Sequence, residues 1–161
     1  MGWMKMELDS LEPLYPAWLG YMYWWEGDFD KAIAEAQKAL ELNPDFPVGL
    51  FVLGNAYADK GMYEQAIVAN KRASRINPGR KWALGITYGK AGSSEEALAI
   101  AAELESQAGV KETWRLALIY AALRDKDKTF YWLNEAYEQR APHIQWFMKD
   151  GNFLCSRILL S

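Results

Sequence analysis

The sequence has only one cysteine, Cys155, and one histidine, His143, among its 161 residues. A single cysteine excludes an internal disulfide, and with a single histidine we expect neither a metal site nor a bound cofactor. No uninterrupted apolar run reaches the roughly 18 residues that a membrane-spanning helix needs, so we expect no membrane insertion. Positive charge is not in excess either, because the chain has 18 basic and 21 acidic residues and a net charge of −3. This balance argues against a nucleic-acid partner.

What remains is a composition typical of a globular protein, with 51% hydrophobic and 24% charged residues. The first ten residues lack the basic and then apolar layout of a secretory signal, so we expect a cytoplasmic location. The unusual feature is the presence of eight tryptophans. Their positions along the chain decide the functional hypothesis.

A short motif recurs at nearly constant spacing. Leu19-Gly20 and Tyr23 are followed 34 residues later by Leu53-Gly54 and Tyr57. Further copies occur at Leu84-Gly85 with Tyr88 and at Leu116-Ala117 with Tyr120, after steps of 31 and 32 residues. Many positions repeating at one offset indicate an internal structural repeat.

The repeated pattern resembles the tetratricopeptide repeat, a helix–turn–helix unit of 34 residues. The resemblance implies an all-α fold, a right-handed α–α superhelical solenoid of about four repeats. The fourth copy departs from the family pattern, since Arg124 replaces the turn glycine and Thr129 replaces a small alanine. The predicted ranges are 1–12 for the end of a preceding repeat helix, 13–46, 47–77, 78–109 and 110–141 for the repeats, and 142–161 for a C-terminal capping segment.

The closing segment, from Leu116 to Pro142, supports a narrower resemblance. It is similar to the C-terminal tetratricopeptide regions of bacterial adenylate cyclases, serine/threonine kinases and winged-helix transcription regulators. That resemblance implies a fragment of a larger bacterial signalling or regulatory protein.

Local sequence supports the helices independently of any family. Ala32–Leu42 and Ala97–Gln107 are rich in strong helix formers. Pro44 and Pro78 end the second helices of two repeats, because proline cannot continue a helix. The run from Ser93 to Glu96 predicts a capping box at the start of another helix.

The tryptophans concentrate on one predicted surface. If each repeat begins at Pro13, Pro47, Pro78 or Val110, positions 2, 5, 9, 12 and 13 span an arc of about 100° on the first helix. In a solenoid of helix pairs, this arc lines the concave side. We predict there an aromatic groove that binds a peptide or an amphipathic helix of a partner protein. Its predicted residues are Tyr21, Trp24, Trp25, Phe51, Asn55, Trp82, Ile86, Lys90, Trp114 and Leu118.

Two alternatives remain open at this point. The apolar C-terminal stretch, or strong curvature of the solenoid, could fill the groove from within the chain. A homo-oligomer could instead pair two grooves, which would give the protein a structural role. The carboxylate clamp of chaperone-binding tetratricopeptide domains is a poor match, because only Asn55 occupies a clamp position.

No set of residues predicts catalysis, and we expect no enzymatic activity. The segment from Gly85 to Gly92 resembles a phosphate-binding loop, but its spacing is one residue short and Ala91 replaces the hydroxyl residue. His143 has no definable nucleophile, and Cys155 lies among apolar residues like a small buried hydrophobe. The basic residues from Lys71 to Lys81 are interpreted as a solvated edge.

Overall fold

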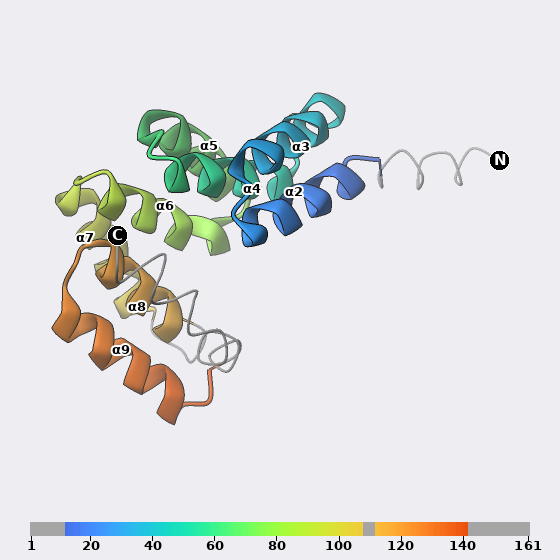
Figure 1. The fold of residues 1–161 in the computed structure, drawn as a ribbon. Helices are drawn as coiled ribbons and strands as arrows, with labels where there is room; N and C mark the ends of the chain where they lie inside the picture. Colours follow the sequence, from blue (N-terminus) through green and yellow to red (C-terminus); the bar gives the residue numbers. More distant parts are fainter. Residues whose placement is uncertain (1–11, 108–111, 142–161) are drawn as a thin grey trace. The chain divides into compact units, whose positions relative to one another are not determined.

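The computed structural model describes residues 12–107 and 112–141. Every regular element in those residues is helical, which confirms the all-α prediction. The elements are α2 (Leu14–Glu26), α3 (Phe29–Leu42), α4 (Pro47–Asp59), α5 (Tyr63–Ile76), the 3-10 helix η1 (Pro78–Arg80), α6 (Lys81–Lys90), α7 (Ser94–Ser106), α8 (Thr113–Ala122) and α9 (Lys126–Glu138). Figure 1 shows successive helices joined by short turns.

The chain divides into two compact units, residues 1–87 and 88–161. In the first unit, α2 packs against α3 and α4, and α4 packs against both α3 and α5. In the second unit, α8 packs against α7 and α9. The predictions made for residues 1–11 and 142–161 lie outside the described residues, and the repeat bounds stay a prediction.

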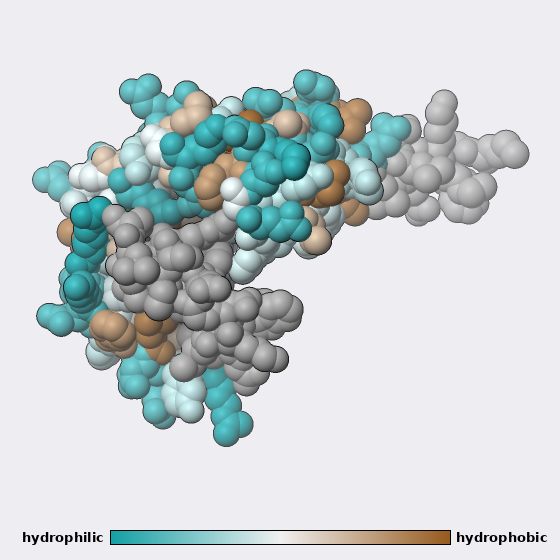
Figure 2. All heavy atoms as spheres, viewed as in Figure 1, coloured by the Kyte–Doolittle hydropathy of each residue, from teal (hydrophilic) through white to brown (hydrophobic). Residues whose placement is uncertain are grey.

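Small residues bring the helices of each pair together. Ala32, Ala36 and Ala39 on α3 are fully buried, as is Ala66 on α5. Because alanine lacks a long side chain, neighbouring helix backbones approach closely along these positions. Hydrophilic side chains cover much of the described surface in the view of Figure 2, with scattered hydrophobic ones between them.

The turn within each repeat has the same backbone hydrogen bond in all four copies. The carbonyl oxygens of the motif tyrosines Tyr23, Tyr57, Tyr88 and Tyr120 accept from the amides of Asp28, Met62, Ser93 and Asp125, at 2.9 to 3.0 Å. This bond requires the residue before the donor to adopt a left-handed conformation. Gly27, Gly61 and Gly92 do so with φ of 85°, 76° and 80°.

Helix caps differ from one second helix to the next. Asp28 and Asp125 cap α3 and α9 by accepting hydrogen bonds from the backbone amides of Lys31 and Lys128. Hydrogen bonds from the side chain and backbone of Lys31 lower the pKa of the Asp28 carboxyl. The predicted capping box at Ser93 is wrong in its bonding: α7 begins where expected, but the Ser93 side chain makes no capping hydrogen bond.

The two departures of the fourth repeat have different consequences. Thr129 is buried, and its hydroxyl donates to the Asp125 carbonyl at 2.6 Å, so the extra polar atom is satisfied. Arg124 takes the place of the turn glycine with φ of 60°. A left-handed conformation is unfavourable for an L-residue with a Cβ, so this turn is strained.

Replacing Arg124 with glycine is therefore expected to raise the free energy of unfolding by about 1 kcal/mol, because glycine adopts this conformation without the steric penalty. Urea titration followed by circular dichroism measures the change. The matched control is Gly61→Ala, which should lower stability by a similar amount, since a Cβ there meets no atom within 4 Å and only the backbone changes. Equal stability of the Arg124→Gly variant and the parent would contradict the strain at this turn.

Candidate functional site: an aromatic cluster on the first helices

Five aromatic residues of the predicted groove form one network of ring contacts in the first unit. Tyr21 lies 5.7 Å from Trp24, 6.1 Å from Trp25 and 6.5 Å from Phe51, measured between ring centroids. Phe51 lies 5.7 Å from Trp82. We call Tyr21, Trp24, Trp25, Phe51 and Trp82 the aromatic cluster. It joins α2, α4 and α6, the first helices of three successive repeats.

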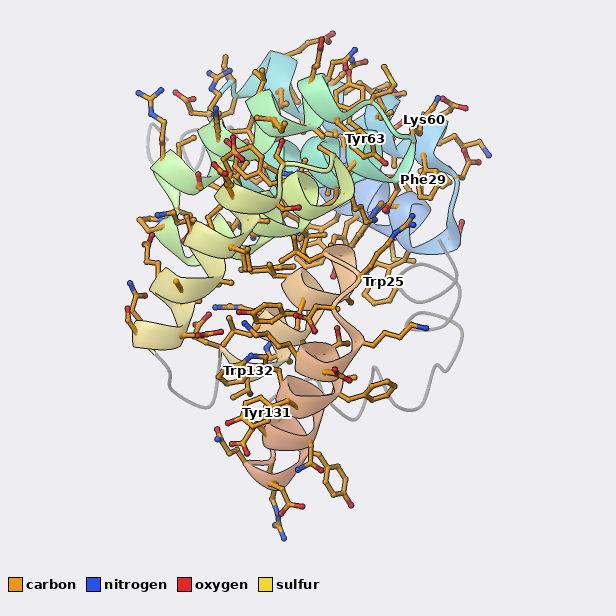
Figure 3. All side chains as sticks on the ribbon, turned by 90° about the vertical axis from the view of Figure 1, so that its left-hand side faces the viewer. Trp25, Phe29, Lys60, Tyr63, Tyr131 and Trp132 are labelled. Atoms are coloured by element: carbon orange, nitrogen blue, oxygen red, sulfur yellow. The ribbon has the colours of Figure 1, made fainter. Side chains whose placement is uncertain are left out.

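The members of the aromatic cluster differ in their exposure. Trp24 and Phe51 are buried, with 8% and 5% of their surface exposed, and Tyr21 and Trp82 are half-buried. Trp25 is 39% exposed. Figure 3 shows Trp25 at the turn end of the first helix pair, on the side where Phe29, Lys60 and Tyr63 also lie. The cluster therefore has an inner layer that packs and an outer layer that solvent reaches.

Two polar contacts hold the inner layer in place. The indole Nε1 of Trp24 donates to Asp59 Oδ2 on α4 at 2.7 Å, which ties the first repeat to the second. Asn55 is buried, and its Nδ2 donates to the Phe51 carbonyl one turn earlier at 2.8 Å. Donation from Asn55 to a partner's backbone stays a prediction, and in this structure that amide donor serves its own helix.

The Arg80 guanidinium lies over the Phe51 ring, 4.4 Å from its centroid. A cation above an aromatic face is attracted by the ring quadrupole. Sequence reasoning placed Arg80 in a basic stretch and missed this role.

The remaining predicted residues are divided between the two units. Ile86 is half-buried on α6 in the first unit, whereas Lys90, Trp114 and Leu118 belong to the second. Leu118 is buried on α8. Trp114 packs with Leu133 against the buried pair Ala136 and Ala141. Trp114 thus stabilises the fourth helix pair, a role that sequence reasoning missed.

A second polar network surrounds the motif tyrosine of the fourth repeat. Tyr120 is buried, and its hydroxyl donates to Glu105 Oε1 at 2.7 Å while the Lys128 ammonium lies 4.6 Å from its ring centroid. Burial, followed by the hydrogen bond and negative charge of Glu105, raises the pKa of the Tyr120 phenol. The neutral tyrosine links α7 to α8 as a packing contact.

A cavity of about 500 Å³ lies away from the aromatic cluster, between α3, α4 and α5. Its apolar lining includes Leu40, Leu50, Leu53 and Val68. Arg72 at its border is ion-paired with Asp45 at 2.7 Å. Tyr57, Glu64 and Gln65 add polar groups to its lining, and the sequence analysis did not predict this cavity.

Within residues 12–107 and 112–141, no group of three or more histidine, cysteine, aspartate or glutamate side chains is placed to hold a metal ion. His143 and Cys155 lie outside the described residues. The helices in the described part of the chain are all too short or too polar to cross a bilayer.

The fold and the cluster define a class of proteins, the helix-pair repeat proteins. Residues 24–85 match the tetratricopeptide-repeat family model. The chain is also 40% identical over 60 residues to a TPR repeat-containing protein of Methanocaldococcus jannaschii, a match that covers 37% of this chain and 18% of that protein. Residues 24–85 are therefore similar in sequence to tetratricopeptide repeats.

A solved structure extends the fold assignment beyond the matched residues. A thermophilic TPR protein of Thermus thermophilus superposes with a TM-score of 0.68 at 22% identity, covering 96% of this chain and 86% of that chain. The predicted all-α solenoid of tetratricopeptide repeats is confirmed. Such solenoids present extended surfaces that act as scaffolds for protein interactions. The narrower resemblance to cyclases, kinases and transcription regulators stays a prediction.

Proposed function

We propose that the protein is a non-enzymatic interaction scaffold that binds a peptide or an amphipathic helix of a partner protein against the aromatic cluster. The observation that supports this most strongly is the continuity of the five rings across three successive first helices, with Trp25 open to solvent. A packing core has no need to extend large rings to the surface. An anchor for a partner does, because tryptophan and tyrosine bury a large area with few rotatable bonds.

The division of the cluster into two layers suits binding. Trp24 and Phe51 support the outer rings from beneath, and Asp59 fixes the indole of Trp24. Trp25, Tyr21 and Trp82 then meet the partner. Rings held in place before binding lose little freedom on association, which improves affinity.

The aromatic cluster that would receive the partner is mostly apolar, with the Arg80 guanidinium over Phe51 and the Asp59 carboxylate bonded to Trp24 as its charged neighbours. An amphipathic helix would place anchors at successive turns, one for each first helix. Ile86 extends this surface in the first unit. Contacts of the partner with Lys90, Trp114 and Leu118 of the second unit stay a prediction.

The experiment selects helical peptides from a displayed library against the full chain and measures their affinity by tryptophan fluorescence. The Trp25→Ala variant is expected to weaken binding by at least about tenfold, because it removes an exposed anchor. Trp82→Ala should act in the same direction, with a lower melting temperature because Trp82 also packs on Phe51.

The control is Trp132→Ala on α9, where the Trp132 ring lies 5.1 Å from the Tyr131 ring (Figure 3). This variant removes a tryptophan outside the aromatic cluster and should leave the peptide affinity unchanged. Equal affinity of the parent and the Trp25→Ala variant would contradict the proposal. Two further outcomes separate the alternatives. Binding that appears only after deletion of residues 143–161 indicates a groove filled by the chain itself, and binding that competes with self-association indicates paired grooves.

A further inference from the structure

A second apolar surface on α2 borders the aromatic cluster, where the Trp18 ring lies 5.6 Å from the Tyr21 ring. Tyr15, Trp18 and Met22 are 75%, 52% and 58% exposed, and Trp25 continues the line at its end. Their spacing of three, four and three residues places them on one stripe along the helix. We call these four residues the α2 stripe.

The same repeat positions are buried in α4, and the equivalents of Trp18 and Met22 are buried in α6. Residues 34 positions after Tyr15, Trp18 and Met22 are Gly49, Val52 and Ala56, and all three are buried. A Cβ on Gly49 would lie 3.2 Å from Leu40 Cδ2, so α3, the second helix of the preceding repeat, covers this face of α4. In α6, buried Thr87 accepts a hydrogen bond from Asn70 of α5 at 2.9 Å. This face of a first helix is therefore a helix-packing face, and in α2 it bears large apolar side chains that are exposed.

We propose that the α2 stripe of a second copy of this chain covers this face, with the two α2 helices antiparallel about a twofold axis. An antiparallel twofold pairs position 15 with 25 and position 18 with 22, because the stripe is centred on residue 20. These pairs are Tyr with Trp and Trp with Met. The Tyr–Trp pair can form an edge-to-face contact, and the Trp–Met pair can form a thioether–aromatic contact. A stripe that matches itself in this way is what an isologous interface requires.

The electrostatics of α2 agree with this arrangement. The helix contains one charged residue, Glu26, and no basic residue. Its N-terminal turn has no side-chain cap and no acidic residue. The antiparallel pairing places the acidic residues Glu12 and Glu26 at the ends of the seam and leaves the α2 stripe itself uncharged.

The area is sufficient for a weak dimer. From their exposed fractions, the four side chains offer about 500 Å² of mostly apolar surface per copy. The total of about 1,000 Å² reaches the lower limit of specific interfaces. We expect a dimer that dissociates in the micromolar range.

Sedimentation of the full chain over a concentration series tests the proposal. We expect a reversible monomer–dimer equilibrium. Trp18→Lys or Met22→Glu alone should raise the dissociation constant by more than about tenfold, because each places a charge in the apolar seam. A mixture of these two variants should form the dimer again, since antiparallel pairing sets Lys at 18 opposite Glu at 22. The control Val68→Glu changes an equally exposed apolar residue on α5 and should leave the equilibrium unchanged.

Three results would overturn the proposal. One is a full chain that stays monomeric at every concentration. This result would overturn the proposal even if a variant lacking residues 1–11 dimerised. Another is a dimer that neither variant weakens, or that the mixture fails to restore. The last is the formation of assemblies larger than a dimer that require the exposed residues Phe130 and Tyr137 of α9. Such assemblies would indicate head-to-tail stacking of copies. Trp25 belongs to both surfaces, and the Trp18 ring lies 5.6 Å from the Tyr21 ring of the aromatic cluster, so the dimer would compete with the peptide. Peptide affinity is therefore measured at a concentration at which sedimentation shows a monomer.

Discussion

Phe51→Ala is expected to lower the free energy of unfolding by about 3–5 kcal/mol, the usual effect of removing a buried phenylalanine. Phe51 is the central ring of the aromatic cluster, in contact with Tyr21, Trp24 and Trp82. Its removal leaves a cavity bordered by aromatic side chains and takes away the ring beneath Arg80. Urea unfolding followed by tryptophan fluorescence measures the loss.

The control for Phe51→Ala is Phe130→Ala, the same change at a phenylalanine on α9 that is mostly exposed. That variant should change stability by less than about 0.5 kcal/mol. If Phe51→Ala had a similarly small effect, the three first helices would not be joined through this ring. The proposal that the inner layer holds the outer one in place would then lose its support.

Gly54→Ala is expected to lower the free energy of unfolding by about 2–3 kcal/mol, the effect of forcing an extra methyl group into a packed contact. A Cβ on Gly54 would overlap the Asn70 side chain, at 2.5 Å from its Cγ and 2.8 Å from its Nδ2. Asn70 cannot move away easily, because it is buried and its Nδ2 donates to Thr87 Oγ1. Thermal and urea unfolding measure the destabilisation.

The matched experiment combines Gly54→Ala with Asn70→Ala. The equivalent positions on α3 and α7 are the buried alanines Ala36 and Ala101, so alanine fits this place in the repeat. Asn70→Ala alone should lower stability by about 1 kcal/mol through the lost hydrogen bond. The double variant should be more stable than Gly54→Ala alone, because the clash is gone. Strictly additive losses would show that the two residues do not meet.

The sequence predicted more of the fold than of the site, for a physical reason that particular residues illustrate. The motif Leu-Gly-x-x-Tyr and the turn glycines recur because each repeat needs the same close helix contacts and the same left-handed turn. Such local requirements leave a periodic signal. Arg124 was recognised as a departure by its position, and its strained backbone followed.

The candidate site depended on contacts between repeats, which leave no such signal. The helical arc placed Trp24 and Trp25 together, but it could not show that Trp24 is buried and hydrogen-bonded to Asp59 while Trp25 stays exposed. It also assigned Trp114 to the groove without its packing against Ala136 and Ala141. Adjacent tryptophans on one helix differ in this way because neighbouring helices decide which ring they cover.

The amino-acid sequence by itself determined the helical class, the repeat and the places of its turns, since helix propensity, proline, glycine and small-residue spacing act within one or two helices. Only the tertiary structure decided which aromatic rings pack and which remain at the surface. Burial depends on side chains that come together from distant parts of the chain, as Phe51 comes together with Tyr21 and Trp82. The same contacts left Tyr15, Trp18 and Met22 exposed at positions that the second repeat buries with Gly49, Val52 and Ala56.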